Sequence, residues 1–568
     1  MNEIWRRYSF QICPSMAKMM TTSKNITVAD SAMFMVKGGI TIKTVEHKEL
    51  QEHQTVVLKT KFLPNPFRKL ARIPTLKGRL LFESAEHVAL GDQIELMVPE
   101  TDSPVSAHSL KISLANGLSL TYGQILALGG DFYGVPYRPI SSGVGTSWQT
   151  ENFFAAFNSL ATEPSAKDEA TAILKSMKME IDAVIEEKTS GDSLTAQAYD
   201  KMEEKLNAGY IKATGGKGYV VGDMASRYLL LAATNIDHFG DDAVTAYRIG
   251  HTAALLVAQQ GAKENDSTNK RALLMKAYAM NAFADHFLTD LFSAGHLRVP
   301  RKSLLSICGL YFGNFCAKHM HDEDSRFGLN VKNKNGKMWR TYGDKMYFDT
   351  CNSLNRAIAK SAVQVSANEV YEVFSNGVFN VQDKLKALDY IPDLVAINDV
   401  DNNDLGNFSP MFRWNGVTVT TRSNLNDLSS SQTVFWSTAL THFKFTGKNP
   451  FESYAPVPPA GRLAAPAKAP VLKMSDASGE RTSHQEVRYA YTLKSDDKFF
   501  AESNLSPWSD YLYIPNNRYP CLSDILTGGA NVHRRIVYRQ FKGKEYEYAG
   551  EVRDNTTTTF DDRYYLKR

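Results

Sequence analysis

The stretch Asn281–Arg301, NAFADHFLTDLFSAGHLRVPR, places ionisable side chains inside an otherwise apolar helical pattern. His286 and Asp290 lie four residues apart, so on a helix they share one face and their side chains can converge on one ion. His296 follows six residues later, after three small residues that allow the helix to end or bend. This stretch predicts a helix that presents metal ligands, with His296 placed to serve a second ion.

Two other stretches supply residues of the same kind. Upstream, in residues 235–258, Asp237 lies just before a predicted helix and His251 falls on the apolar face of that helix. Downstream, AKHMHDED at residues 317–324 adds two imidazoles and three carboxylates at the end of an apolar helix. A single His-x-x-x-Asp pair is more often satisfied within a helical core. Three such stretches together favour a metal centre, because buried imidazoles and carboxylates are costly without a partner.

The order and spacing of these residues resemble the zinc-dependent phospholipase C and P1/S1 nuclease superfamily. Asp237 precedes His251 by fourteen residues, and a His-x-x-x-Asp-x-x-x-x-x-His block follows, as in that family. The segment HFLTDLFSAGHLRVPR is more similar to the bacterial zinc phospholipase C-like branch than to the nucleases. The resemblance covers residues 110–344, which is less than half of the chain.

This resemblance implies a zinc-dependent phospholipase C that hydrolyses the glycerol-side phosphodiester bond of a phospholipid such as phosphatidylcholine. The products would be diacylglycerol and a phosphorylated head group. It also implies two or three zinc ions, bridged by Asp290, with Asp237 doubling as the general base. A P1/S1-like single-strand nuclease, another zinc phosphodiesterase and a non-catalytic binding protein are the alternatives. The expected metal ligands are Asp237, His251, His286, Asp290, His296, His321 and Asp324.

The final ligand pair is ambiguous by spacing. His319 with Glu323 fits a spacing of four residues, and His321 with Asp324 fits a spacing of three, so either pair can share a helix face. We prefer His321 with Asp324. Family members complete a third site with an N-terminal Trp and an early His, and no residue near Met1 matches them.

Three further residues are candidates outside that pattern. Asp131 follows two glycines, where a carboxylate is usually part of a turn or cap, and it is our substitute ligand for the third site. Arg298 and Arg301 follow His296 closely enough to hold a phosphate group, although arginines at a helix end are usually solvated.

Composition limits the classes of function. The 568 residues include 43% hydrophobic residues, enough for several globular domains, and the net charge of +4 is too mild to indicate a stable nucleic-acid complex. The five scattered cysteines predict neither a disulfide framework nor a thiolate zinc site. No apolar run reaches the length of a signal peptide or membrane span. We therefore expect a soluble protein that meets a phospholipid or membrane surface peripherally, or one exported by a non-Sec route. The sequence leaves the compartment and the oligomeric state undefined.

The predicted fold class is α+β and multidomain, with a mainly helical metal-binding catalytic domain between β-rich modules. Asn335-Gly336 indicates a hairpin or loop over the site. The strongest helical patterns cover residues 223–233, 241–260, 270–292, 303–321 and 349–374. The predicted divisions are an N-terminal β-rich module at 1–107, a helical zinc phosphodiesterase domain at 108–454, a proline-rich linker at 455–471 and a sandwich-like C-terminal β-rich module at 472–568.

Overall fold

A computed structural model gives the fold, in which the chain divides into two compact units. The first is Met1–Leu76 with Val220–Ala225, and the second is Lys77–Tyr219 with Ser226–Arg568. The structure describes residues 31–36, 39–44, 61–62, 84–101, 103–190, 195–216, 226–399, 405–425, 428, 432–435, 463, 465–475, 485–495, 503, 505–515, 518–530, 532–543 and 546–563.

In the first unit the described residues form one antiparallel sheet. Strands β1 (Ser31–Val36) and β2 (Gly39–Thr44) make a hairpin, and β3 (Lys61–Phe62) pairs with β2. These strands lie within the predicted N-terminal β-rich module, and most of residues 1–83 of that module lie outside the described residues.

The second unit is organised around helix α9 (Ser267–Asp290), which carries His286 and Asp290 near its C-terminal end. Asp266 caps its first turn by accepting a hydrogen bond from the Asn269 N–H group, and every residue from 277 to 290 is buried. A helix buried on all sides needs neighbours around it. Helices α8 (Gly240–Lys263), α12 (Ser353–Asn376) and α3 (Tyr122–Leu128) pack against it.

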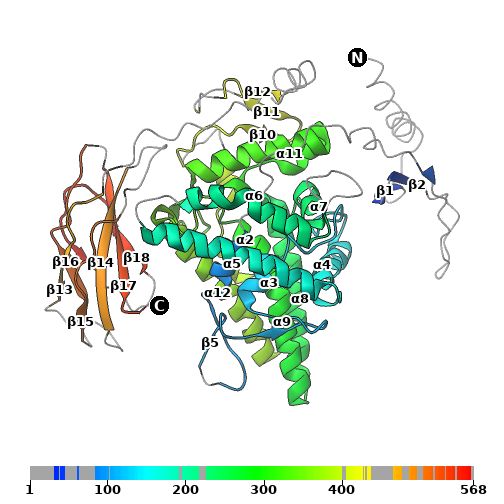
Figure 1. Cartoon of the computed structure of the whole chain (residues 1–568), viewed down its shortest axis with the longest axis horizontal. Coiled ribbons are helices and arrows are strands. Elements are labelled where there is room, and N and C mark those ends of the chain that lie inside the picture. The colour runs from blue at the N-terminus through cyan, green and yellow to red at the C-terminus, as the bar shows by residue number, and fades with distance from the viewer. Residues whose placement is uncertain are drawn as a thin grey trace. The chain divides into compact units, whose positions relative to one another are not determined.

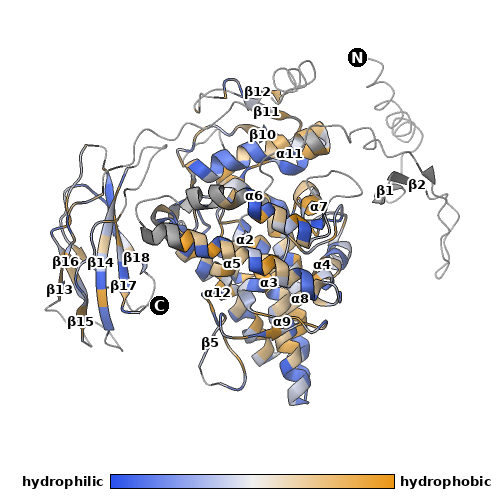
Figure 2. Ribbon diagram, in the orientation of Figure 1, coloured by the Kyte–Doolittle hydropathy of each residue, from blue (hydrophilic) through white to orange (hydrophobic). Residues whose placement is uncertain are grey.

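Other helices surround this core (Figure 1). Their apolar and polar residues can be followed along the ribbons in Figure 2. All five predicted helices are confirmed, at α7, α8, α9, α11 and α12, with ends shifted by a few residues. Helix α11 is interrupted at Gly309, which has φ 77°. The surrounding helices are α2 (Ser84–Gly91), α4 (Thr146–Ala161), α5 (Ala166–Ser190), α6 (Thr195–Ala213), α7 (Arg227–Thr234), α10 (Ala294–Leu297), α11 (Arg301–Phe327) and α13 (Leu394–Asn398), with 3-10 turns η2 (Thr350–Asn352) and η3 (Lys386–Asp389).

Short hairpins accompany these helices. Gly336 has φ 77° in the turn between two strands, which confirms the predicted hairpin. The hairpins are β4 (Glu95–Leu96) with β5 (Val105–Ser106), β6 (Ile112–Ser113) with β7 (Ser119–Leu120), and β8 (Leu329–Lys332) with β9 (Met338–Thr341).

The predicted boundary at residue 107 does not coincide with the structural division, because residues 84–107 fall in the second unit and begin with α2 rather than a strand.

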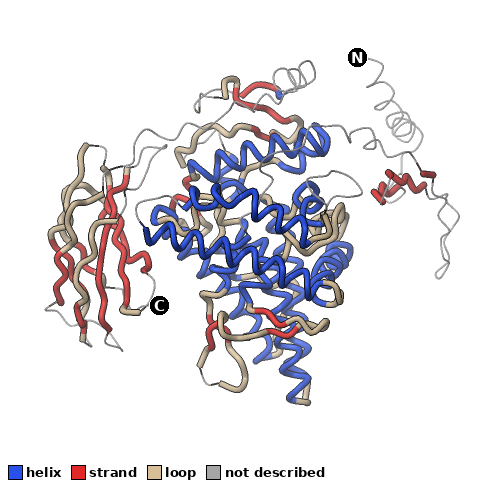
Figure 3. The backbone as a smooth tube through the Cα atoms, viewed as in Figure 1, coloured by secondary structure: helices blue, strands red, loops and turns tan. Residues whose placement is uncertain are grey.

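Antiparallel sheets make up the described C-terminal part of the chain (Figure 3). Tyr489 and Tyr491 are fully buried in its core. The chain thus mixes helices with antiparallel sheets, as the α+β class requires. The strand orders are β10 (Phe412–Trp414), β11 (Val419–Arg422), β12 (Gln432–Val434); β13 (Val471–Met474), β16 (Pro520–Ser523), β19 (Phe560–Asp561); and β15 (Leu512–Ile514), β14 (Gln485–Lys494), β17 (Arg534–Phe541), β18 (Tyr546–Val552).

Candidate metal centre

Asp290, the last residue of α9, lies at the centre of a cluster of imidazoles. Its Oδ2 atom is 2.7 Å from His238 Nδ1 and 3.6 Å from His286 Nε2. Its Oδ1 atom is 3.1 Å from His296 Nδ1 and 3.7 Å from His87 Nε2. Burial opposes the charge of this carboxylate, but the neighbouring imidazoles hold the pKa of Asp290 well below its usual value. The two oxygens of one carboxylate therefore face different pairs of histidines.

The donor atoms fall into three groups, each compact enough to hold a metal ion. Within each group all donor atoms lie within 4.8 Å of one another. His286 belongs to two of the groups, and Asp290 contacts residues of all three, so the groups form one continuous centre. The groups are His87, His286 and Asp290; Asp131, His238 and His286; and His296, His321 and Asp344.

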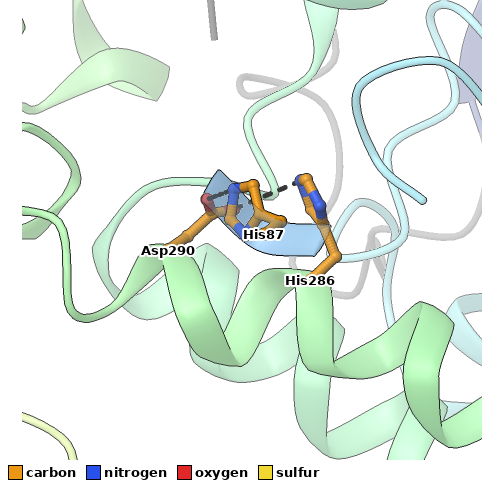
Figure 4. A group of neighbouring side chains, drawn as sticks. All are labelled: His87, His286 and Asp290. Carbon is orange, nitrogen blue, oxygen red and sulfur yellow. Dashed lines mark ion pairs between the residues drawn. The ribbon is translucent and has the colours of Figure 1, made fainter. Parts of the chain in front are cut away.

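Hydrogen bonds to the outer ring nitrogens orient two of these histidines. His286 Nδ1 lies 3.0 Å from the Leu126 carbonyl, and His87 Nδ1 lies 2.8 Å from Thr289 Oγ1, so both rings present Nε2 to the centre. Figure 4 shows His87 from α2 and His286 from α9 reaching toward Asp290. A second hydrogen bond of this kind is what fixes the tautomer and direction of metal-binding histidines.

Asp131 enters the centre from a glycine turn after α3. Gly130 has φ 70°, and a Cβ atom at that position would lie 2.4 Å from His286 Cδ2, so only glycine allows this approach. Asp131 Oδ1 is 3.8 Å from the Nε2 atoms of both His238 and His286. Its other oxygen accepts a hydrogen bond from Ser84, and burial raises the pKa of Asp131 to about 8. The structure thus brings the expected substitute ligand into the cluster.

The third group joins α10, α11 and the segment after β9. His321 Nε2 lies 3.2 Å from Asp344 Oδ2, and Ser293 donates a hydrogen bond to Asp344 Oδ1. A Cβ atom at Gly295 would lie 2.5 Å from His321 Cδ2. The small residues before His296 therefore permit the close approach that the sequence suggested.

The donor set fits a metal ion. Buried polar atoms nearly always have hydrogen-bond partners. Asp131 Oδ1 is buried, yet it makes no hydrogen bond among the described residues, and the two imidazole nitrogens beside it are 3.8 Å away. Tetrahedral ligands about 2.0–2.1 Å from an ion lie about 3.3 Å apart, and the 3.1 Å, 3.2 Å and 3.6 Å separations around Asp290 and Asp344 are close to that value.

Two predicted ligands that precede α9 in the sequence, Asp237 and His251, lie outside these groups. Both oxygens of Asp237 accept backbone N–H groups, Oδ2 from Ile140 and Oδ1 from Ser141, so this carboxylate holds a loop. His251 faces the interior between α8, α9 and α12, where Nε2 lies 3.3 Å from Glu369 Oε2 and Nδ1 contacts Asn281. The spacing of fourteen residues between these two is real, but their side chains do not converge.

The remaining candidates on the α10–α11 side are held by partners of their own. Arg298 makes a bidentate, buried ion pair with Asp324, at 2.9 Å and 2.7 Å, so neither faces the centre. Glu323 is paired with Arg422. Arg301 donates to the Ala232 carbonyl and to Asn314 Oδ1. His319 lies in none of the three groups, and burial lowers its pKa to about 4.

The sequence interpretation missed three residues of the centre: His87, His238 and Asp344. His238 stands beside the predicted Asp237, in the turn between α7 and α8, and it points to the opposite side. Asp344 follows the predicted Asn335-Gly336 hairpin in sequence, which was the one available signal for it. His87 lies in a short helix that the sequence did not predict.

A second buried polar network lies beside the centre, on the opposite side of α9. Asp285 accepts hydrogen bonds from Tyr122 and Ser366, and Asn281 donates to Tyr122. Burial raises the pKa of Asp285 to about 7, against the effect of these hydrogen bonds. This network joins α3, α9 and α12, and thereby fixes the helix that carries His286 and Asp290.

A pocket of about 60 Å³ opens onto the centre. That volume holds about four water molecules, or a group the size of a phosphate. Its lining includes Glu86, His87, Asp290, Ser293, Tyr342, Asp344, Tyr347 and Arg356.

No protein-family model and no curated protein matches this chain in sequence. Among the described helices, none combines the length and apolar character that crossing a membrane requires.

Proposed function

We propose that this protein is a zinc-dependent phosphoric diester hydrolase of the phospholipase C type. The observation that carries the proposal is the position of Asp290, whose two oxygens face separate groups of buried donors. Metal-dependent phosphodiester hydrolysis commonly uses two ions bridged in this way. The products would be diacylglycerol and a phosphorylated head group.

Zinc is the metal we propose, in two or three ions. The donors are imidazole nitrogens and carboxylate oxygens with no thiolate, a set typical of catalytic rather than structural zinc sites. The chemistry that zinc supplies when bound is Lewis acidity toward phosphoryl oxygens and acidification of a water molecule. His87, Asp290 and Asp344 also line the pocket, so the proposed ligands are reachable by a substrate phosphate.

The proton acceptor needs a different assignment from the one that the resemblance implied. Both oxygens of Asp237 are engaged by backbone N–H groups, which leaves them poorly placed to take a proton from water. Besides Asp290, the carboxylates that line the pocket are Glu86 and Asp344. Asp344 is a proposed zinc ligand whose oxygens contact Ser293 and His321. We therefore propose that Glu86 holds the proton after water attacks the phosphorus atom.

One observation supports a phospholipid over a nucleic acid. The net charge of +4 is small for a chain of 568 residues, whereas nucleic-acid binding depends on clustered positive charge. Phosphatidylcholine is the substrate that the family resemblance favours.

The test compares three substrates under one set of conditions. Zinc-loaded protein is incubated with phosphatidylcholine vesicles, single-stranded DNA and bis(p-nitrophenyl) phosphate, and the products are separated by chromatography. We expect diacylglycerol and phosphocholine from the vesicles. Turnover of DNA without lipid would assign a P1/S1-like nuclease instead. Bound zinc without any turnover would assign a binding protein.

A further inference from the structure

Arg356 lines the pocket that opens onto the metal centre. It belongs to the first turn of α12 and lines the same pocket as His87, Asp290 and Asp344. Its exposed fraction is 9%, so its charge is largely removed from bulk water. Arginine stays protonated even when its side chain is buried. A poorly screened positive charge beside the pocket attracts an anion more strongly than an exposed one would.

Contacts with Tyr347 fix the position of this guanidinium. Arg356 Nη1 donates a hydrogen bond to the Tyr347 carbonyl at 2.7 Å, and its Cζ atom lies 5.3 Å from the centre of the Tyr347 ring. Both contacts hold the planar group against the pocket wall. Arg356 is also the one lysine or arginine among the described residues that line this pocket.

The arginines that the sequence suggested for phosphate binding are committed elsewhere. Arg298 pairs with Asp324 and donates to the Phe408 carbonyl, and neither arginine suggested by the sequence lines the pocket. The cation nearest to a substrate phosphate in the pocket therefore comes from α12 rather than from the segment after His296.

We propose that Arg356 forms an anion subsite that binds a non-bridging oxygen of the substrate phosphate. This inference rests on the proposed function and names the part of the substrate that the protein itself recognises. Arginine donates charge-assisted hydrogen bonds to phosphate oxygens, and its rigid planar group loses less freedom for each hydrogen bond formed than lysine does. The ligand class is a phosphate ester or free phosphate.

The test measures binding of inorganic phosphate to zinc-loaded protein by titration calorimetry, so it needs no turnover. Arg356→Gln should weaken phosphate binding about ten- to a hundredfold, the loss typical of a hydrogen bond to a charged group. Arg356→Lys should recover part of that loss. Arg271→Gln is the matched control, because Arg271 pairs with Glu100 at an exposed site outside the pocket.

Zinc content and melting temperature are measured for every variant. Equal phosphate affinity in Arg356→Gln and the parent protein, with zinc retained, would overturn the subsite, as would a parent protein that binds no phosphate. Phosphate binding that depends on Arg356 in a protein that hydrolyses no phosphodiester would support the subsite and reject the proposed function. The two proposals therefore fail separately.

Discussion

Replacing each of two aspartates by asparagine distinguishes a metal ligand from a carboxylate that only forms a structural ion pair. Asp324 was expected to bind metal, but it is fully buried in a bidentate pair with Arg298, whose side chain is 2% exposed. Asp324→Asn removes one charge and leaves Arg298 buried without its partner. Breaking a buried pair in this way costs about 3–5 kcal/mol, a large part of the roughly 5–15 kcal/mol that stabilises a typical protein.

Asp344→Asn is the matched substitution inside the centre. The amide oxygen can still accept the hydrogen bond from Ser293, but the charge beside His321 Nε2 is lost. We expect a smaller loss of metal-free stability than in Asp324→Asn, because His321 can become neutral whereas Arg298 stays charged. Loss of a ligand beside His296 and His321 should remove at least one zinc ion and most of the activity. Urea unfolding of the metal-free proteins measures the first effect, and elemental analysis measures the second.

The expected pattern is a double contrast. Asp324→Asn should lower the free energy of unfolding and keep its zinc at low temperature, whereas Asp344→Asn should lose less stability and should lose zinc. The reverse pattern, with zinc lost only from Asp324→Asn and stability unchanged, would refute the assignment of these two carboxylates.

Three further outcomes are expected. His321→Ala should abolish most zinc-dependent hydrolysis while His319→Ala stays near the parent rate; equal loss in a phosphodiester assay would contradict this. Gly130→Ala places a Cβ atom 2.4 Å from an imidazole of the centre and should lower zinc affinity. Gly117→Ala, also at positive φ but with no atom within 4 Å of its Cβ position, should leave zinc affinity unchanged in the same zinc titration. Burial raises the pKa of Asp285 from 3.8 to about 7, so its contribution to stability is fully present below pH 3.8 and is lost as pH rises through about 7. Asp285→Asn should therefore flatten that decline in unfolding experiments on metal-free protein. An unchanged pH profile would exclude Asp285 as its origin.

Sequence alone identified the parts of the centre that follow from local geometry. His286 and Asp290 are one turn apart on a single helix, so their convergence needs no knowledge of the fold. His296 follows through a short segment of small residues, and helix spacing leaves His321 as one of two options. These four residues do lie together.

The remainder depends on how helices pack, which spacing does not specify. His251 lies on the buried face of α8, as predicted, but that face meets α12 and Glu369 rather than the metal groups. Asp237 and His238 are neighbours whose side chains point to different sides of a turn, so a shift of one residue exchanges a loop-holding carboxylate for a member of the centre. His87 reaches the centre only because α2 packs on α3 and α9.

Zinc content of the purified protein, with and without Asp290→Asn, tests the central claim most directly. Asp290 contacts donors of every group, so its loss should disrupt them together. Elemental analysis should find two or three zinc ions per parent chain and less than one per Asp290→Asn chain, with helical content preserved. Less than one zinc ion in the parent protein, or the same zinc content in both proteins, would contradict a metal centre built around Asp290.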